Sequence, residues 1–333
     1  AMNNGLEDDS LEKTIVYLAS ANDINRQIER LPELLHGLLA LGDCYLKQGK
    51  ADEVRAVAIE AQKIALETFN DKARAYAIHM QGYNSFVTKN YNEAAHFAIN
   101  AGEIYEEAAS YDEACEVYMA AGRLYRWRGE RAKSIDAFER ALAVARIENS
   151  LENIVHAKAW LAFVQARVER VVDYETIAAS LSQTQSQMQM AKPKLGTTRR
   201  YELAYAWNNV DKNPAEALKH FDHWLEQARF NKVINDSVEA MLGRQYCFAH
   251  MFANEEMIKA ALSVLATLED IEATVDPLEA ITPLSGFYFA TEQFVEAEQL
   301  WVRGKAIAEK NNASVETLKY YDQMIAMSIS EYA

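Results

Sequence analysis

Small residues recur along the chain at a fixed spacing, each followed by a larger residue about one helical turn later. Four stretches align at intervals of 40 residues: LGDCY (41–45), QGYNS (81–85), AGRLY (121–125) and LAFVQ (161–165). Their second residues are all small: Gly42, Gly82, Gly122 and Ala162. Less regular copies follow at 204–208, 242–246 and 285–289. A small residue with a bulky one on the same face is what two closely crossing helices require, so the pattern predicts seven copies of one helical unit.

Each copy is followed by a short polar turn and a second segment with helical spacing. The turns lie at 49–52, 89–94, 128–132, 211–217 and 291–297. In the second segments a small residue stands four positions before a bulkier one at Ser134/Phe138, Ala217/Phe221 and Ala297/Trp301, and Ala94/Ala98 has the same spacing. Pro214 falls where the first turn of a helix tolerates a missing N–H. With only 12 Gly and 5 Pro in 333 residues, we expect repeated helix–turn–helix units and almost no strand.

These paired signatures resemble the tetratricopeptide repeat (TPR). LGDCY and LGRQY match the L-G-x2-Y of its first helix, and AEALKHF contains the A-x3-F of its second. The resemblance spans residues 31–311 and implies an all-α, right-handed superhelical α-solenoid of about seven TPR-like helix-turn-helix repeats with terminal capping helices. The repeat is about 40 residues long rather than the usual 34 or so, which indicates longer helices, like those of bacterial regulatory TPR domains.

The expected organisation has three parts. Residues 1–30 form an N-terminal tail with a capping helix from Leu11 to Ala21, and residues 31–311 form the solenoid. Residues 312–333 form a C-terminal capping helix from Val315 to Tyr332. The polar and then basic stretch near 182–200 is expected to be a frayed helix end plus a loop, either simply solvated or in contact with a partner.

Composition narrows the function classes. A formal net charge of −15 opposes broad attraction to nucleic acid and to anionic membranes. The first residues contain no basic or apolar leader, and no apolar run reaches about 18 residues. The three cysteines stand far apart without a CxxC, which argues against a disulfide framework or a zinc knuckle. We therefore expect a soluble cytoplasmic protein that binds neither nucleic acid nor membrane.

Motifs for catalysis are weak. The sequence has no G-x-S-x-G, no P-loop and no G-x-G-x-x-G. His220 and His223 stand three positions apart, but no third ligand accompanies them, so they are expected to be solvated helix residues rather than a metal pair. Cys44 and Cys115 occupy small packed positions and are expected to be buried apolar residues rather than nucleophiles. We expect no enzyme activity, no metal and no cofactor.

The stretch AAGRLYRWRG concentrates arginine and aromatic residues. Arg123, Arg126 and Trp127 stand at i, i+3 and i+4, so they share one helical stripe. The TPR resemblance implies that this stripe lines a concave groove. In the other copies the same register gives Tyr76, His79, Tyr83, Phe86, Phe163, Arg167, Arg199, Glu202, Asn209, Arg244 and Phe248. The alternative is that Trp127 packs under its neighbour and the arginines pair with Glu116 or Glu130.

A groove that mixes arginine with aromatic residues favours recognition of carboxylates beside apolar side chains. The groove lacks the Lys and Asn clamp of chaperone-binding TPR domains, because Asp43 stands where Asn would be needed. We therefore expect a non-catalytic protein- or peptide-binding module, a scaffold or adaptor, whose ligand is an acidic segment. The alternative is a peptide-sensing regulatory TPR protein that switches a signalling partner, some of which have phosphatase activity. A homo-oligomer is compatible with either function.

Overall fold

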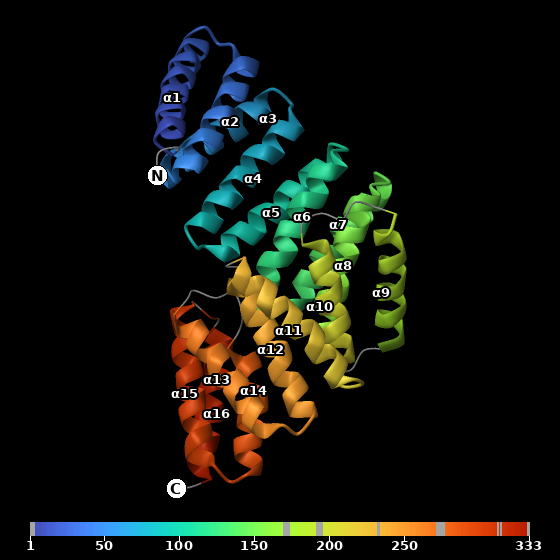
Figure 1. The fold of residues 1–333 in the computed structure, drawn as a ribbon. Helices are drawn as coiled ribbons and strands as arrows, with labels where there is room; N and C mark the ends of the chain where they lie inside the picture. The colour runs from blue at the N-terminus through green and yellow to red at the C-terminus, as the bar shows by residue number, and fades with distance from the viewer. Residues whose placement is uncertain are drawn as a thin grey trace. The chain divides into compact units, whose positions relative to one another are not determined.

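All regular secondary structure in the described part of the chain is α-helical. The computed structural model describes residues 4–168, 174–190, 196–231, 234–270, 277–311, 313 and 315–331, and within these ranges sixteen α-helices follow one another without a strand (Figure 1). The expected all-α solenoid fold is confirmed. Among the described residues, no helix combines the length and the apolar composition needed to cross a membrane.

The chain divides into two compact units, one made of residues 1–125 and 132–157 and the other of residues 126–131 and 158–333. The first unit contains the greater part of α1 to α7: α1 (Asn4–Gln27), α2 (Leu31–Gln48), α3 (Ala51–Glu67), α4 (Asp71–Val87), α5 (Tyr91–Glu107), α6 (Tyr111–Trp127) and α7 (Arg131–Ile147). Consecutive helices such as α2 and α3, or α4 and α5, pack against each other.

The second unit contains most of α8 and all later helices: α8 (Leu151–Val168), α9 (Tyr174–Met188), α10 (Thr197–Asn209), α11 (Pro214–Phe230), α12 (Ile234–His250), α13 (Asn254–Asp270), α14 (Leu278–Ala290), α15 (Phe294–Lys310) and α16 (Val315–Ser330). Here too, neighbours in sequence pack together, for example α11 with α12 and α15 with α16. In chain order, the seven expected helix pairs correspond to α2/α3 through α14/α15, with α1 before them and α16 after them.

The turns between consecutive helices from α1 to α8 share one backbone geometry. A residue with positive φ occurs every 20 residues from position 29 to position 149: Glu29, Gly49, Phe69, Lys89, Ala109, Gly129 and Asn149. At Phe69, for instance, its own N–H donates to Leu66 O and the next N–H donates to Ala65 O. These two bonds form a Schellman motif, which satisfies carbonyls left open at the helix end. A helix of about 17 residues and a three-residue turn therefore account for the 40-residue period of each pair.

Small residues do mark close contacts between helices in most copies. A Cβ on Gly122 would lie 2.7 Å from the Phe138 ring, and one on Gly243 would lie 2.2 Å from the Phe221 ring. Phe138 and Phe221 are buried, as are their spaced partners Ser134 and Ala217. The seventh copy differs, because a Cβ on Gly286 would meet nothing within 4 Å. The expected close contact at Gly286 is therefore wrong.

Two expected segments, one at the N-terminus and one near residues 182–200, differ in extent from the structure. The N-terminal helix runs from Asn4 to Gln27 and is longer than the stretch from Leu11 to Ala21. The stretch near 182–200 is helical at both ends, since α9 continues to Met188 and α10 begins at Thr197. Residues 191–195, which include the rest of the expected loop, lie outside the described residues.

Candidate functional site

In the first unit, the predicted groove residues lie on α4 and α6. The α4 residues Tyr76, His79, Tyr83 and Phe86 recur every three or four positions, so they share one face of that helix. Tyr83 is 48% exposed and its ring lies 6.3 Å from that of Phe86. This face of α4 therefore offers an accessible aromatic surface.

Polar groups from three helices meet beside these aromatic rings. The Tyr76 hydroxyl donates to Asp43 Oδ1 on α2 over 2.7 Å, and burial together with this carboxylate raises the pKa of Tyr76. His79 lies edge-on to Tyr76, with ring centroids 6.5 Å apart. Burial lowers the pKa of His79, against the opposing effect of Glu116 and Asp43. Burial also lowers the pKa of Arg123 on α6, where Glu116 again opposes it.

In the second unit, two of the predicted groove residues, Arg126 and Phe163, lie close to each other. The Arg126 guanidinium lies 4.9 Å from the centre of the Phe163 ring, and its Nη2 is 2.5 Å from Glu239 Oε2 on α12. The Glu239 side chain is only 1% exposed. A buried carboxylate is costly unless it is paired, so this bond satisfies a charge that the fold has removed from water.

Two further arginines lie at the start of α10. Arg200 Nη2 donates to Asp236 Oδ1 over 2.9 Å, and Arg199 Nη1 lies 2.7 Å from Asp236 Oδ2. The Arg200 guanidinium also stacks over Trp160 at 4.3 Å and over Phe163 at 5.1 Å. We call Arg126, Arg199 and Arg200 with Asp236 and Glu239 the arginine cluster.

The cluster perturbs the pKa of its most buried arginine, Arg200. The pKa of Arg200 is lowered to about 10: burial has the largest effect, the neighbouring guanidiniums of Arg126 and Arg199 add to it, and Asp236 and Glu239 oppose it. A guanidinium whose proton affinity falls by this much is held among positive charges in a site of low polarity. An additional anion at this point would be favourable.

Sequence reasoning found Arg126, Phe163 and Arg199 but missed four residues that complete the site: Trp160, Arg200, Asp236 and Glu239. Two signals were present in the sequence. Arg200 directly follows Arg199, and Asp236 and Glu239 stand three positions apart at the start of α12, so that they share a face.

The other predicted groove residues of this unit have separate contacts. Arg244 pairs with Asp222 at 2.7 Å and lies over Phe248 at 5.6 Å, and Glu202 accepts from Trp224 Nε1. Asn209 donates to the Tyr205 carbonyl. Trp127 is partly buried, and the side chain of Arg167 lies outside the described residues.

The alternative arrangement of the 120–131 stretch holds in part. Arg128 Nε lies 2.6 Å from Glu130, as that alternative expected, and Arg131 lies 3.6 Å from Glu279. Arg126 pairs with Glu239 rather than with either of the expected glutamates. One charged stretch thus contains both an ordinary surface pair and a buried contact.

Cysteine and histidine behave as structural residues. Cys44, Cys115 and Cys247 are buried cysteines outside any disulfide, and burial raises the pKa of the Cys247 thiol to about 12. Thiols of this kind are poor nucleophiles. The ring of His220 lies edge-on to that of Tyr205, and the ring of His223 lies edge-on to that of Trp224. Within the described ranges, no group of three or more His, Cys, Asp and Glu side chains is placed to hold a metal ion.

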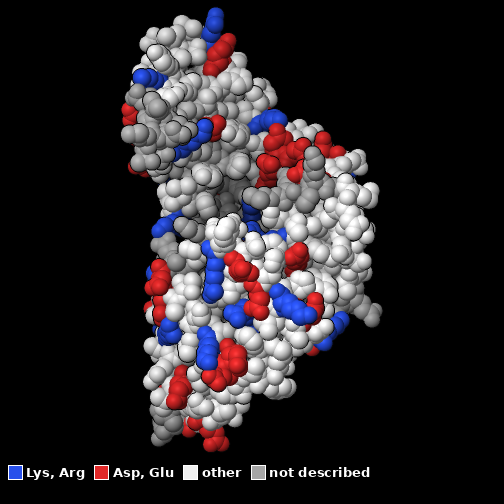
Figure 2. Space-filling model, viewed as in Figure 1, with Lys and Arg blue, Asp and Glu red and all other residues white. Residues whose placement is uncertain are grey.

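Charges of both signs are interspersed on the surface. Figure 2 shows Lys and Arg side chains scattered among Asp and Glu on the visible face, without one continuous basic surface. Binding to a nucleic-acid backbone depends on many clustered basic groups, and this face does not provide them.

No protein-family model matches the sequence, and no curated protein matches it. Solved structures do resemble it. The apo form of RapI has 11% identity and a TM-score of 0.52, covering 89% of this chain and 97% of that one. A Rap protein complexed with competence and sporulation factor has 13% identity and a TM-score of 0.51, covering 98% and 97%. The apo quorum sensor NprR from B. thuringiensis has 11% identity and a TM-score of 0.50, covering both chains completely. At these identities the likeness concerns the fold, and it confirms that this chain has the TPR-type helical-repeat architecture expected from its sequence.

Proposed function

We propose that this protein is a non-catalytic regulatory module that binds a peptide segment, and that the arginine cluster binds a carboxylate of that peptide. The observation that carries the proposal is an imbalance of charge. Three guanidiniums share two carboxylates, a formal excess of one positive charge in a protein whose net charge is −15. Buried charges are normally balanced by a partner.

Unused donors support the same proposal. The Nε–H groups of Arg199 and Arg200 are buried and make no hydrogen bond within the described chain. A buried donor without an acceptor costs about 1–3 kcal/mol, so an incoming carboxylate would relieve that cost. The Arg199 side chain is 27% exposed whereas that of Arg200 is 10% exposed. Arg199 is therefore the member that a ligand reaches first.

The comparisons favour a regulatory role over a passive scaffold. One similar structure is a complex with competence and sporulation factor, and another is a quorum sensor. We infer that the ligand of this chain is a signalling peptide with an acidic side chain or a free carboxyl terminus, and that its binding alters a second protein contact. Three buried cysteines outside any disulfide fit a reducing compartment, and we place the protein in the cytoplasm.

The test is a selection from a random peptide library with free carboxyl termini on the wild-type protein, followed by anisotropy titrations of the enriched peptides. We expect Asp, Glu or the terminal carboxylate to be essential, and binding to weaken about tenfold or more in Arg199→Gln, because a charge-assisted hydrogen bond is lost.

Arg303→Gln is the matched control. Arg303 belongs to the same unit, pairs with Glu269 and has a side chain that is 30% exposed. Both variants are first checked for unchanged melting. Equal binding by Arg199→Gln and the wild type overturns the assignment of the site, and a selection that yields only basic or only phosphorylated peptides overturns the proposed ligand class.

A further inference from the structure

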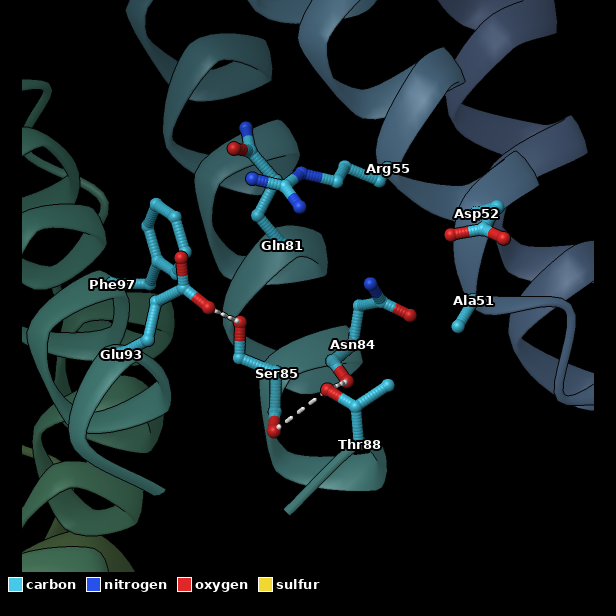
Figure 3. A pocket seen from close by; sticks show the side chains of 9 residues that line it. All are labelled: Ala51, Asp52, Arg55, Gln81, Asn84, Ser85, Thr88, Glu93 and Phe97. Carbon is cyan, nitrogen blue, oxygen red and sulfur yellow. Dashed lines mark hydrogen bonds between the residues drawn. The ribbon is translucent and has the colours of Figure 1, made fainter. Parts of the chain in front are cut away.

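A small polar cleft lies in the first unit, on the side of α4 opposite to the predicted groove. It is lined by the start of α3, the second half of α4 and the start of α5 and has a volume of about 110 Å³ (Figure 3). Its α4 residues include Gln81, Asn84 and Ser85. At about 100° of rotation per residue, these point away from the face that carries Tyr76 and Tyr83. The cleft therefore lies off the predicted groove face of α4, and it shares no residue with the arginine cluster of the second unit.

Several lining groups already have partners. Glu93 accepts from the Ser85 hydroxyl and from Asn90 Nδ2, each over 2.9 Å. Gln81 donates to Gln62 Oε1, and the Thr88 hydroxyl donates to the Asn84 carbonyl. These bonds fix one wall of the cleft.

Three other side chains that line the cleft have no such partner within the described residues. Asp52, Arg55 and the Asn84 amide form no ion pair or side-chain hydrogen bond with the described part of the chain. Asp52 and Arg55 stand one turn apart on α3, a spacing at which opposite charges often pair. Figure 3 shows Arg55 extending from α3 toward Gln81, with Asp52 nearer the start of that helix and the Asn84 amide projecting from α4. A cation, an anion and an amide thus surround one small space.

This combination complements a small zwitterion. A guanidinium offers parallel donors to a carboxylate, an aspartate accepts from an ammonium group, and an amide both donates and accepts. The volume is several times the roughly 30 Å³ of a water molecule but well below the 300 Å³ or so where drug-sized pockets begin. We propose that the cleft binds a free α-amino acid, with its carboxylate on Arg55, its ammonium on Asp52 and its side chain toward Phe97.

Charge sets the preference among amino acids. Arg55, Asp52 and Glu93 together carry a formal charge of −1, so anionic ligands are disfavoured. Neutral polar and basic amino acids bind in preference to aspartate, glutamate or inorganic phosphate.

The experiment is calorimetric titration of the full chain with L-glutamine, L-arginine, L-glutamate and inorganic phosphate. We expect saturable binding of L-glutamine or L-arginine, at least about tenfold weaker binding of L-glutamate, and no binding of phosphate. Arg55→Gln should weaken amino-acid binding about tenfold or more. Lys63→Gln is the matched control, because Lys63 is an exposed cation on the same helix outside the cleft.

A second variant separates the two ends of the ligand. Asp52→Asn should weaken the binding of L-glutamine but leave N-acetyl-L-glutamine, which has no ammonium group, at its wild-type affinity. Both variants change exposed residues and should melt like the wild type. The proposal is overturned if no amino acid binds up to about 10 mM, if phosphate binds instead, or if Arg55→Gln binds as the wild type does. None of these outcomes bears on peptide binding at the arginine cluster.

Discussion

Arg200 Nη2 donates to Asp236 Oδ1 over 2.9 Å, joining the first turn of α10 to the first turn of α12. Both side chains are nearly buried, with 10% and 6% exposure. Asp236 also lies beside Arg199, so a single carboxylate balances two guanidiniums. The bond therefore fixes the register of two helices and also sets the charge of the proposed peptide site.

Removal of this carboxylate should be strongly destabilising. Asp236→Asn leaves two largely buried arginines without their anion, and breaking a buried pair costs about 3–5 kcal/mol. Urea unfolding should show the loss. The control is Asp322→Asn, whose side chain is 59% exposed and pairs with Lys305. That variant should change the free energy of unfolding by no more than about 1 kcal/mol, and equal midpoints for the two would show that the buried pair contributes little.

Acidification should destabilise the first unit through His79. Burial holds the pKa of His79 below its ordinary value of 6.5, so the unfolded chain takes up the proton first as the pH falls. Stability is then lost below about pH 6.5, by up to about 1.4 kcal/mol per pH unit for one proton. Thermal melts between pH 7.5 and pH 5.5 should show a shallower dependence for His79→Gln. The exposed His96→Gln serves as the control, and identical pH profiles for His79→Gln and the wild type would argue against this role.

Replacement of two glycines of the second unit by alanine should change the stability of the protein in opposite directions. In Gly243→Ala the new methyl group lies 2.2 Å from the Phe221 ring, and overpacking of this kind costs about 1–3 kcal/mol. In Gly286→Ala the methyl group meets nothing within 4 Å. Its better helix propensity should stabilise the protein by about 0.5–1 kcal/mol. Differential scanning calorimetry measures the melting temperatures of both variants. A melting temperature for Gly286→Ala below that of the wild type would show that the methyl group does meet a neighbouring atom.

In the first unit, replacement of alanine by glycine should likewise have opposite effects on stability at a left-handed turn and inside a helix. Ala109 has a φ of 54°, a conformation that costs an L-residue roughly 1–2 kcal/mol. Ala109→Gly should therefore be neutral to stabilising, by up to about 1 kcal/mol after the entropy of glycine is subtracted. Ala56→Gly, on the exposed side of α3, should cost about 1 kcal/mol. Chemical denaturation of the two variants measures their free energies of unfolding. A lower free energy of unfolding for Ala109→Gly than for the wild type would contradict the prediction.

The sequence alone determined the repeating helix pairs. Gly122 with Phe138, and Gly243 with Phe221, show the reason: side-chain size at helical spacing is a local property that also decides how closely two consecutive helices approach. Even so, the left-handed residues at the turns were not visible, because Phe69, Lys89 and Ala109 adopt positive φ without being glycine. There the Schellman hydrogen bonds override the preference of the residue itself.

Only the tertiary structure decided which charges meet. Arg126 was identifiable as a candidate, but its carboxylate is Glu239, 113 residues away, rather than Glu116 or Glu130 nearby. Arg200 and Asp236 are 36 residues apart on separate helices. Repeat spacing predicts which helices are equivalent, whereas the pairing of long charged side chains depends on helix register and on the burial that neighbouring repeats impose. Burial then determines which charges pair, because a carboxylate removed from water must be paired with a cation that can reach it.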